Sequence, residues 1–184
     1  MKFTPTDLQD AVTIELEKRA DERGFFARTF CAEEFARAGL ETVFPQSNHS
    51  RNRLKGTLRG MHFQRRPHGE AKLVRVVQGA IHDVIIDIRP ESPSFGRWQG
   101  FDLDAESGRM LYVPAGFAHG FQTLQDDTDI SYQVSHSYTP GAEGGLCWDD
   151  PRFAIRWPLP VASISEKDAA WPHVDEAALA TLLG

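Results

Sequence analysis

The feature that most constrains the fold is a run of short apolar segments, separated by turn residues, between positions 44 and 157. The clearest segment, 81–88, is rich in β-branched residues, which favour strands over helices. Turn signals interrupt the pattern about every 8–12 residues, a spacing typical of the connections between strands. The pattern therefore predicts an all-β sandwich or barrel.

Several strands can be assigned individually. Val12, Ile14 and Leu16 alternate with polar residues and predict an early strand. A second strand is expected at 25–30, so that the N-terminal part forms a hairpin. The strands of the main β region are expected over 72–78, 81–88, 98–103, 110–113, 118–124 and 130–136.

Two short helices are expected outside the main β region. Segment 32–38 is closed by Gly39, and segment 175–183 has one apolar side. The chain has 184 residues, enough to bury the core of one domain. We expect a single domain built from an N-terminal hairpin and helix (1–43), a barrel core (44–157) and a C-terminal wrap and helix (158–184).

Composition excludes several classes of function. The chain carries 20 Lys and Arg against 26 Asp and Glu, a net charge of −6, which argues against a nucleic-acid partner. No apolar run approaches the ~20 residues that cross a membrane, and no secretory signal is expected at the N-terminus. Cys31 and Cys147 lie far apart without a CxxC spacing, which favours free thiols in a reducing cytoplasm.

The stretch Gly56–Gln64 places Arg59 and His62 three residues apart. On a regular strand an offset of three puts two side chains on opposite faces. Gly60 lies between them and can supply a bend or bulge that returns both to one face. His62 can then act as a general base near neutral pH, while Arg59 holds an anion.

The motif Pro114-Ala-Gly-Phe-Ala-His119 resembles the second half of the cupin signature, a turn between strands of a small jelly roll. Metal-binding cupins carry His-x-His and then Glu in the first half, where this chain has His62-Phe-Gln64 and Lys72. A divalent metal needs lone-pair donors, and a nearby ammonium repels it. We therefore expect a mainly β, cupin-type jelly-roll barrel without a metal. The alternative is that His62 and His119 are ordinary barrel histidines.

Other polar residues have two readings on pattern alone. Arg59, Lys72 and His119 would form a positive pocket for a small anion such as a phosphate ester, although Lys72 could equally be a solvated strand-end residue. Tyr132 lies in a β-patterned segment, where it either packs and hydrogen-bonds or faces the cavity as a general acid. Asp168 lies in an irregular segment, where an aspartate is most often a helix N-cap or a turn residue.

Motifs along nearly the whole chain, in order and without large gaps, resemble the dTDP-4-dehydrorhamnose 3,5-epimerases, the deoxysugar-nucleotide epimerases of the cupin class. Each motif is weak alone, but the ordered set is specific. The motifs are Asp21-Glu-Arg-Gly-Phe-Phe26, Gln46-Ser-Asn-His-Ser50, Leu58-Arg-Gly-Met-His-Phe-Gln64, Lys72-Leu-Val-Arg-Val76, Asp83 to Arg89, Ser92-Pro-Ser-Phe-Gly96, Pro114-Ala-Gly-Phe-Ala-His-Gly-Phe121, Tyr132, Tyr138-Thr-Pro140, Trp148-Asp-Asp-Pro151 and Ser165-Glu-Lys-Asp168.

The resemblance implies a reaction and its catalytic residues. The substrate would be a dTDP-linked 4-keto-6-deoxyhexose, inverted at C3 and C5 to convert dTDP-4-dehydro-6-deoxy-D-glucose into dTDP-4-dehydro-L-rhamnose. The family's catalytic histidine and its partner aspartate match His62 and Asp168. The acid tyrosine matches Tyr132, and the family's lysine before Leu-Val-Arg matches Lys72, which is the natural candidate for a donor to the enolate oxygen. No cofactor and no metal are implied.

The resemblance also implies substrate-binding residues and a homodimer with exchanged N-terminal strands. Arg23 and Phe26 would reach the nucleotide side of a neighbouring subunit's site. The matching substrate-binding positions within the same chain are Gln46, Asn48, Arg59, His119, Tyr138 and Lys167.

The sequence departs from the family pattern at three places near the expected site. The strand around Tyr132 reads Ser-Tyr-Gln-Val, where the family more often has Leu-Tyr-Lys. Asn52 replaces a serine that the family often has, and Glu70 replaces a glutamine. Related enzymes that act at one centre only, or on another nucleotide sugar, therefore remain an alternative. A non-catalytic module that binds a nucleotide sugar is a third reading, but it would need Arg59 and Lys72 without the His62, Tyr132 and Asp168 set.

Overall fold

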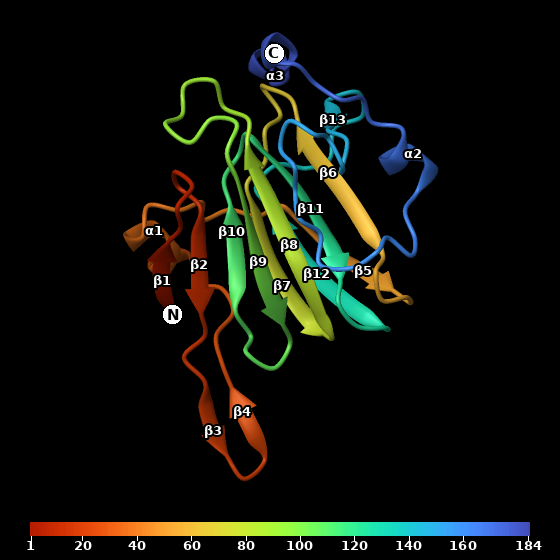
Figure 1. The fold of residues 1–184 in the computed structure, drawn as a ribbon. Coiled ribbons are helices and arrows are strands. Elements are labelled where there is room, and N and C mark those ends of the chain that lie inside the picture. Colours follow the sequence, from red (N-terminus) through yellow and green to blue (C-terminus); the bar gives the residue numbers. More distant parts are fainter.

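The computed structural model describes residues 1–184 and shows two antiparallel sheets packed face to face, with short helices at both ends of the chain (Figure 1). The six-stranded sheet has the order β1-β2-β10-β7-β12-β5. Its strands are β1 (Lys2–Pro5), β2 (Val12–Glu15), β5 (Gln46–Asn52), β7 (Lys72–Gln78), β10 (Met110–Val113) and β12 (Thr128–Val134).

The second sheet has five strands in the order β13-β6-β11-β8-β9. Its strands are β6 (Leu58–Gln64), β8 (Ala80–Asp87), β9 (Trp98–Asp104), β11 (Phe117–Thr123) and β13 (Glu143–Gly145). Apart from β1–β2 and β8–β9, strands adjacent in each sheet are not consecutive in the sequence, as in a jelly roll. The predicted jelly-roll class and the six predicted strands of the main β region are confirmed, with shifts of one or two residues at the ends.

The core between the sheets explains why the alternation in sequence predicts the fold. Residues with a period of two on β7 and β8, such as Val74, Val76, Ile81 and Ile85, point inward and are fully buried. Phe121 on β11 joins the same cluster. At one end of the barrel the inward positions become polar, and the candidate site lies there.

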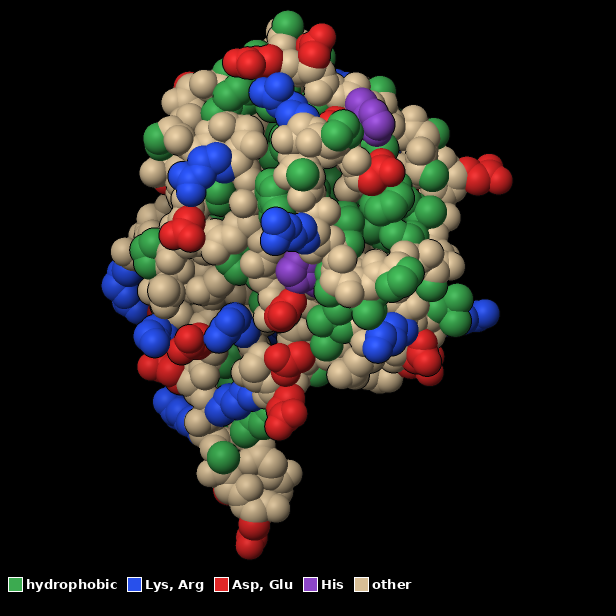
Figure 2. All heavy atoms as spheres, viewed as in Figure 1, with side chains coloured by type: hydrophobic (Ala, Val, Ile, Leu, Met, Phe, Trp, Pro, Cys, Tyr) green, Lys and Arg blue, Asp and Glu red, His purple; other side chains and the backbone are tan.

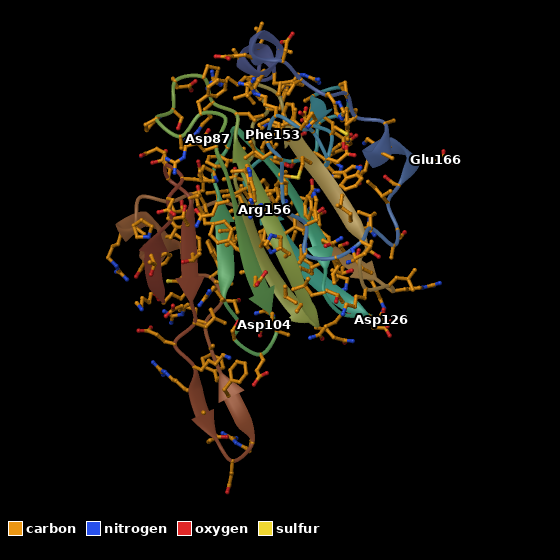
Figure 3. The ribbon with its side chains drawn as sticks, in the orientation of Figure 1. Asp87, Asp104, Asp126, Phe153, Arg156 and Glu166 are labelled. Carbon is orange, nitrogen blue, oxygen red and sulfur yellow. The ribbon has the colours of Figure 1, made fainter.

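The C-terminal segment covers the outer face of the five-stranded sheet. Val84 and Ile86 on β8 pack there against Phe153 and Leu179, which follow the barrel strands in sequence (Figure 3). The segment is attached along the start of β6, where Leu58 N–H donates to the Ser163 carbonyl at 2.8 Å. It carries two helices, α2 (Glu166–Ala169) and α3 (Glu176–Thr181). Helix α3 confirms the predicted C-terminal helix, whereas α2 was not predicted.

The N-terminal part covers the outer face of the six-stranded sheet. Helix α1 (Ala32–Arg37) confirms the predicted short helix and buries Phe35 against Leu73 and Met110. Gly39 follows it with φ of 72°, a left-handed conformation that favours glycine.

The predicted N-terminal hairpin differs from the observed pairing. Strand β2 joins β1 and β10 rather than the segment after residue 24. The hairpin is instead formed by β3 (Arg19–Asp21) and β4 (Gly24–Phe26), and it extends away from the barrel (Figure 1). Strand pairing depends on which edge is free, and periodicity within one segment carries no information about that.

Charges on the surface are mixed. On the face shown in Figure 2, acidic and basic side chains are interspersed, without a continuous basic surface. None of the helices has the length and apolar character that a bilayer-spanning helix requires.

Candidate active site

A cavity of about 140 Å³ lies between the two sheets. Strands β6 and β11 supply one wall, and strands β5, β7 and β12 supply the other. The cavity is lined by Ser50, Arg59, His62, Lys72, His119, Gly120, Phe121 and Tyr132. It therefore collects the predicted base, acid and cations, which are far apart in sequence.

Strand β6 contains the bulge that the sequence predicted at Gly60. His62 and Arg59 are three residues apart on β6, but their partners His119 and Phe121 are only two apart on β11. Gly60 takes up the extra residue with φ of 131°, a conformation that side-chain-bearing residues rarely adopt. The bulge brings Arg59 and His62 to the same wall of the cavity.

His62 and Asp168 form a hydrogen-bonded pair. The distance from His62 Nε2 to Asp168 Oδ1 is 2.7 Å. The other carboxylate oxygen, Oδ2, accepts the Gly60 N–H at 3.2 Å, and the Asp168 N–H donates to Ser165 Oγ at 3.0 Å. Asp168 is thus fixed from three directions, and it orients the imidazole while leaving Nδ1 without a protein partner.

Asp168 is only 5 % exposed and lies inside α2, where Ser165 is the N-cap. The N-cap or turn role that its local pattern favours is therefore wrong. Burial by itself would raise the pKa of Asp168, but the hydrogen bond and charge of His62 and the Gly60 N–H hold it below its usual value. The carboxylate stays ionised at neutral pH and can stabilise an imidazolium.

Tyr132 reaches the cavity from β12 and is partly buried. Its hydroxyl makes no hydrogen bond within the chain, which a purely packing tyrosine usually would. Burial raises the pKa of Tyr132, the nearby Glu70 carboxylate raises it further, and Arg59 opposes the shift. The hydroxyl therefore holds its proton at neutral pH and faces the cavity, which favours the general-acid reading over packing alone.

Lys72 lies at the start of β7 with 7 % of its surface exposed, so the solvated reading of this residue is wrong. Its ammonium lies 3.2 Å from Glu70 Oε1. Gln64 Nε2 donates to Glu70 Oε2 at 3.0 Å, and Gln64 Oε1 accepts the Thr139 N–H at 2.8 Å. Gln64 is thus engaged on both sides of its amide, and together with the ammonium it makes a poor ligand set for a divalent metal.

His119 and Asp83 form a second histidine–aspartate pair. His119 Nε2 lies 2.9 Å and 3.1 Å from the two carboxylate oxygens of Asp83, which is completely buried on β8. Asp83 lies within a motif of the sequence, Asp83 to Arg89, that did not by itself indicate a role for this residue. Its position as a charged residue inside an apolar strand was the available signal.

Arg59 is also oriented by a residue that sequence reasoning did not assign to the site. Its Nε donates to Asn52 Oδ1 at 2.7 Å. Asn52 is buried on β5 and donates in turn to the Thr128 carbonyl at 3.2 Å. The departure from the family pattern at Asn52 therefore lies in direct contact with the anion-binding candidate.

The remaining predicted substrate-binding residues of the barrel lie beside the cavity rather than in its lining. Gln46 Oε1 accepts the Tyr138 N–H at 3.0 Å, and Gln46 Nε2 donates to Asn48 Oδ1 at 2.9 Å. Lys167 pairs with Glu143, a residue missed from the sequence, whose carboxylate also lies 3.5 Å from the Tyr138 hydroxyl. These contacts link Gln46, Asn48, Tyr138 and Lys167 to the β13 side of the barrel.

Arg23 and Phe26 do not contribute to the cavity of their own chain. They lie on the β3–β4 hairpin that extends from the barrel, where Arg23 pairs with Asp21 at 2.6 Å and Phe26 is 70 % exposed (Figure 1).

One cluster of side chains outside the cavity could ligate a metal. Cys147, Asp149 and His173 offer ligand atoms within 4.8 Å of one another, but none of them lines the cavity. Cys147 is one of the two cysteines, both of which are free thiols, as the sequence predicted.

The fold and the cavity define a jelly-roll protein of the cupin class whose cavity is lined by ionisable side chains. A family model described as dTDP-4-dehydrorhamnose 3,5-epimerase matches residues 5–176. The chain therefore belongs to the dTDP-4-dehydrorhamnose 3,5-epimerase family.

Individual relatives agree with this assignment. The dTDP-4-dehydrorhamnose 3,5-epimerase of Methanothermobacter thermautotrophicus is 44 % identical over 95 % of both chains. The Bacillus anthracis enzyme with TDP and PPi bound has a TM-score of 0.91 and 40 % identity, covering 94 % of this chain and 99 % of that one. A 3'-monoepimerase from Streptomyces bikiniensis in complex with dTDP-quinovose is 34 % identical, with a TM-score of 0.85 over 92 % and 86 % of the two chains.

Proposed function

We propose that this protein converts dTDP-4-dehydro-6-deoxy-D-glucose into dTDP-4-dehydro-L-rhamnose by inverting C3 and C5. The observation that carries the proposal is the placement of the His62–Asp168 pair and Tyr132 on opposite walls of one cavity. A non-catalytic binding module would need the cations of the cavity but neither an oriented base nor a protonated acid facing it.

The first step is removal of a proton from carbon. The C–H bonds at C3 and C5 are acidic because both carbons are α to the C4 carbonyl. The Nδ1 lone pair of His62 takes the proton, the C–H electron pair forms a carbon–carbon double bond, and the carbonyl oxygen becomes an enolate oxygen. Asp168 stabilises the imidazolium, and the Lys72 ammonium supports the enolate charge.

The second step returns a proton from the other side. Tyr132 donates its hydroxyl proton to the carbon on the face opposite His62, and the enolate oxygen becomes a carbonyl again. The centre is inverted because removal and delivery occur on opposite faces. Reprotonation of Tyr132 and deprotonation of His62 then complete the cycle. Neither step changes the oxidation state of the substrate, so no cofactor is required.

The substrate's diphosphate would bind to Arg59, whose guanidinium is held by Asn52 and faces the cavity. TDP and PPi bound to the Bacillus anthracis relative support an anionic nucleotide as the ligand class. The remaining contacts to the nucleotide sugar would come from Gln46, Asn48, His119, Tyr138 and Lys167.

We also propose a homodimer in which the β3–β4 hairpin of each chain reaches the partner's cavity. Exposed Phe25 and Phe26 on an extended hairpin support an interface, since isolated two-stranded hairpins are only marginally stable. Mixing the inactive variants H62A and R23A tests it, because a mixed dimer contains one complete site and regains activity. Absence of complementation in a verified mixed dimer would exclude the shared site.

A cytoplasmic location is proposed because both cysteines are free.

The central experiment is incubation with dTDP-4-keto-6-deoxyglucose in D2O, followed by NMR. Deuterium at both C3 and C5 is expected, and His62→Ala abolishes it without unfolding the protein. His49→Ala is the matched control, because this histidine lies on the exposed face of β5. Exchange at one carbon only would favour a monoepimerase, and binding without any exchange would favour a binding module.

A further inference from the structure

An unexpected carboxylate lies at the edge of the proposed anion-binding cavity. Glu70 precedes β7, and its side chain is largely buried with 12 % exposure. It occupies the same face as Lys72, because residues two apart on an extended chain point to the same side. A negative charge at this position opposes the binding of an anionic substrate, so its presence needs a reason.

The contacts of Glu70 give that reason. One carboxylate oxygen is 3.2 Å from the Lys72 ammonium, for which Glu70 is the only ion-pair partner in the chain. The other oxygen accepts from Gln64, and Gln64 is itself held by the Thr139 N–H and the Ser137 carbonyl. The carboxylate is thus fixed by β6 and by the segment after β12, and Lys72 is fixed through it.

We propose that Glu70 is a positioning residue that holds the Lys72 ammonium at the place where the enolate oxygen forms, in the cavity that Tyr132 also lines. This inference rests on the proposed epimerase function. An ammonium that is almost completely removed from water needs a counter-charge, and a flexible lysine side chain needs an anchor before it can serve as a preorganised donor.

The Glu70 carboxylate also acts on Tyr132, which lines the same cavity as the Lys72 ammonium that Glu70 contacts. Burial makes the largest contribution to its raised pKa, followed by the Glu70 carboxylate, while Arg59 acts in the opposite direction. Removal of the Glu70 charge therefore lowers the pKa of Tyr132. The charged or titratable groups that line the same cavity are Arg59 and His62 from β6, Lys72 from β7 and His119 from β11.

The substitution Glu70→Gln removes the charge and retains the shape and an acceptor for Gln64. We expect kcat to fall about tenfold, less than the loss of an entire oxyanion donor. KM stays the same or falls, because a negative charge near the diphosphate has been removed. The alkaline limb of the kcat profile moves toward lower pH, because Tyr132 ionises more easily without the Glu70 charge.

The matched control is Glu91→Gln, which removes a surface carboxylate paired with Arg66 outside the cavity. We expect it to leave kcat, KM and the alkaline limb of the kcat profile unchanged. A double-mutant cycle with Lys72→Met tests the route of action, since E70Q should cost little further kcat at the pH plateau once Lys72 is gone. An equal loss in both backgrounds, or an unmoved alkaline limb, would overturn the proposal. If E70Q does not fold, E70D is the second variant, because it keeps the charge on a side chain that is one methylene shorter. We expect E70D to lower kcat without moving the alkaline limb of the kcat profile.

One readout separates this proposal from the proposed function. Ultraviolet difference titration follows tyrosinate formation without substrate, and Tyr132→Phe identifies the signal of Tyr132. In E70Q that signal should appear at lower pH than in the wild type. If the wild type does not exchange substrate protons, the epimerase proposal fails, and an unmoved Tyr132 titration shows separately that Glu70 does not control its proton.

Discussion

Replacing Asp168 with asparagine tests the role of the histidine–aspartate pair most directly. The two carboxylate oxygens have different partners, since Oδ2 accepts the Gly60 N–H and Oδ1 contacts His62 Nε2. An asparagine keeps its oxygen on the Gly60 N–H and turns its NH2 group toward Nε2. Because this NH2 group can only donate, Nε2 must accept, and the proton of the neutral imidazole moves to Nδ1.

The expected loss follows from this change of tautomer. With a proton on Nδ1, the nitrogen that faces the substrate has no lone pair, and the base is blocked although the geometry is intact. The same replacement in a serine-protease triad, where it also imposes the wrong tautomer, lowers kcat by about 10⁴. We therefore expect D168N to reduce proton exchange by about three to four orders of magnitude, or about 4–5.5 kcal/mol in the activation free energy.

The assay is the initial rate of deuterium incorporation at C3 and C5 with saturating substrate. Glu166→Gln is the matched control, because it makes the same acid-to-amide change on an exposed residue of α2 (Figure 3). Near-ultraviolet circular dichroism confirms that both variants are folded. A folded D168N that retains more than about a tenth of the wild-type rate would refute the tautomer argument, since that loss corresponds to only about 1.4 kcal/mol.

Three further predictions concern other parts of the site. Tyr132→Phe should keep measurable proton exchange but lose most inversion, and equal loss of both in the NMR assay would contradict its role as the acid. Arg59→Met should raise KM about tenfold to a hundredfold with kcat nearly unchanged in steady-state kinetics, because a charge-assisted hydrogen bond to the substrate is lost. Asp168 has a folded-state pKa below its unfolded value, so its stabilising contribution is present above about pH 4 and is lost as pH falls through the folded-state pKa. Urea unfolding of D168N should accordingly converge on the wild type at low pH, and a constant difference down to about pH 2 would contradict the pKa shift.

The strands of the barrel could be predicted from their apolar, β-branched segments and from the turn signals between them. The segment 81–88 illustrates this, with Ile81 and Ile85 in the core between the sheets and Val84 and Ile86 under the C-terminal segment. Burial on both faces made the strand recognisable from its continuous apolar character. The pairing of β2 with β10 could not be predicted in the same way, because it depends on an edge formed by a strand nearly a hundred residues later.

The site was predictable to different degrees for similar reasons. His62 and the cations occur in segments that the sequence predicts as strands, but Lys72 kept two interpretations, and a shared face for Arg59 and His62 required a bend or bulge at Gly60. Asp168 follows no such pattern, because α2 is a single short turn whose position is set by the attachment of Ser163 beside Thr57 and Leu58. Resemblance to a family supplied its role, whereas the long-range contact itself appears only in the folded chain.

Gly60 shows how closely these parts depend on one another. Its conformation creates the bulge that places Arg59 and His62 on one wall, and its N–H donates to the carboxylate that orients His62. A Cβ at this position would lie 2.5 Å from the Gly120 Cα on β11, so no larger residue fits without separating the two strands. Gly60 thus contributes both to the strand register and to the hydrogen bonds that hold the Asp168 carboxylate beside His62. The arrangement of His62 depends on the way β6 packs against β11 and the C-terminal segment, because on a regular strand His62 and Arg59 would point to opposite faces.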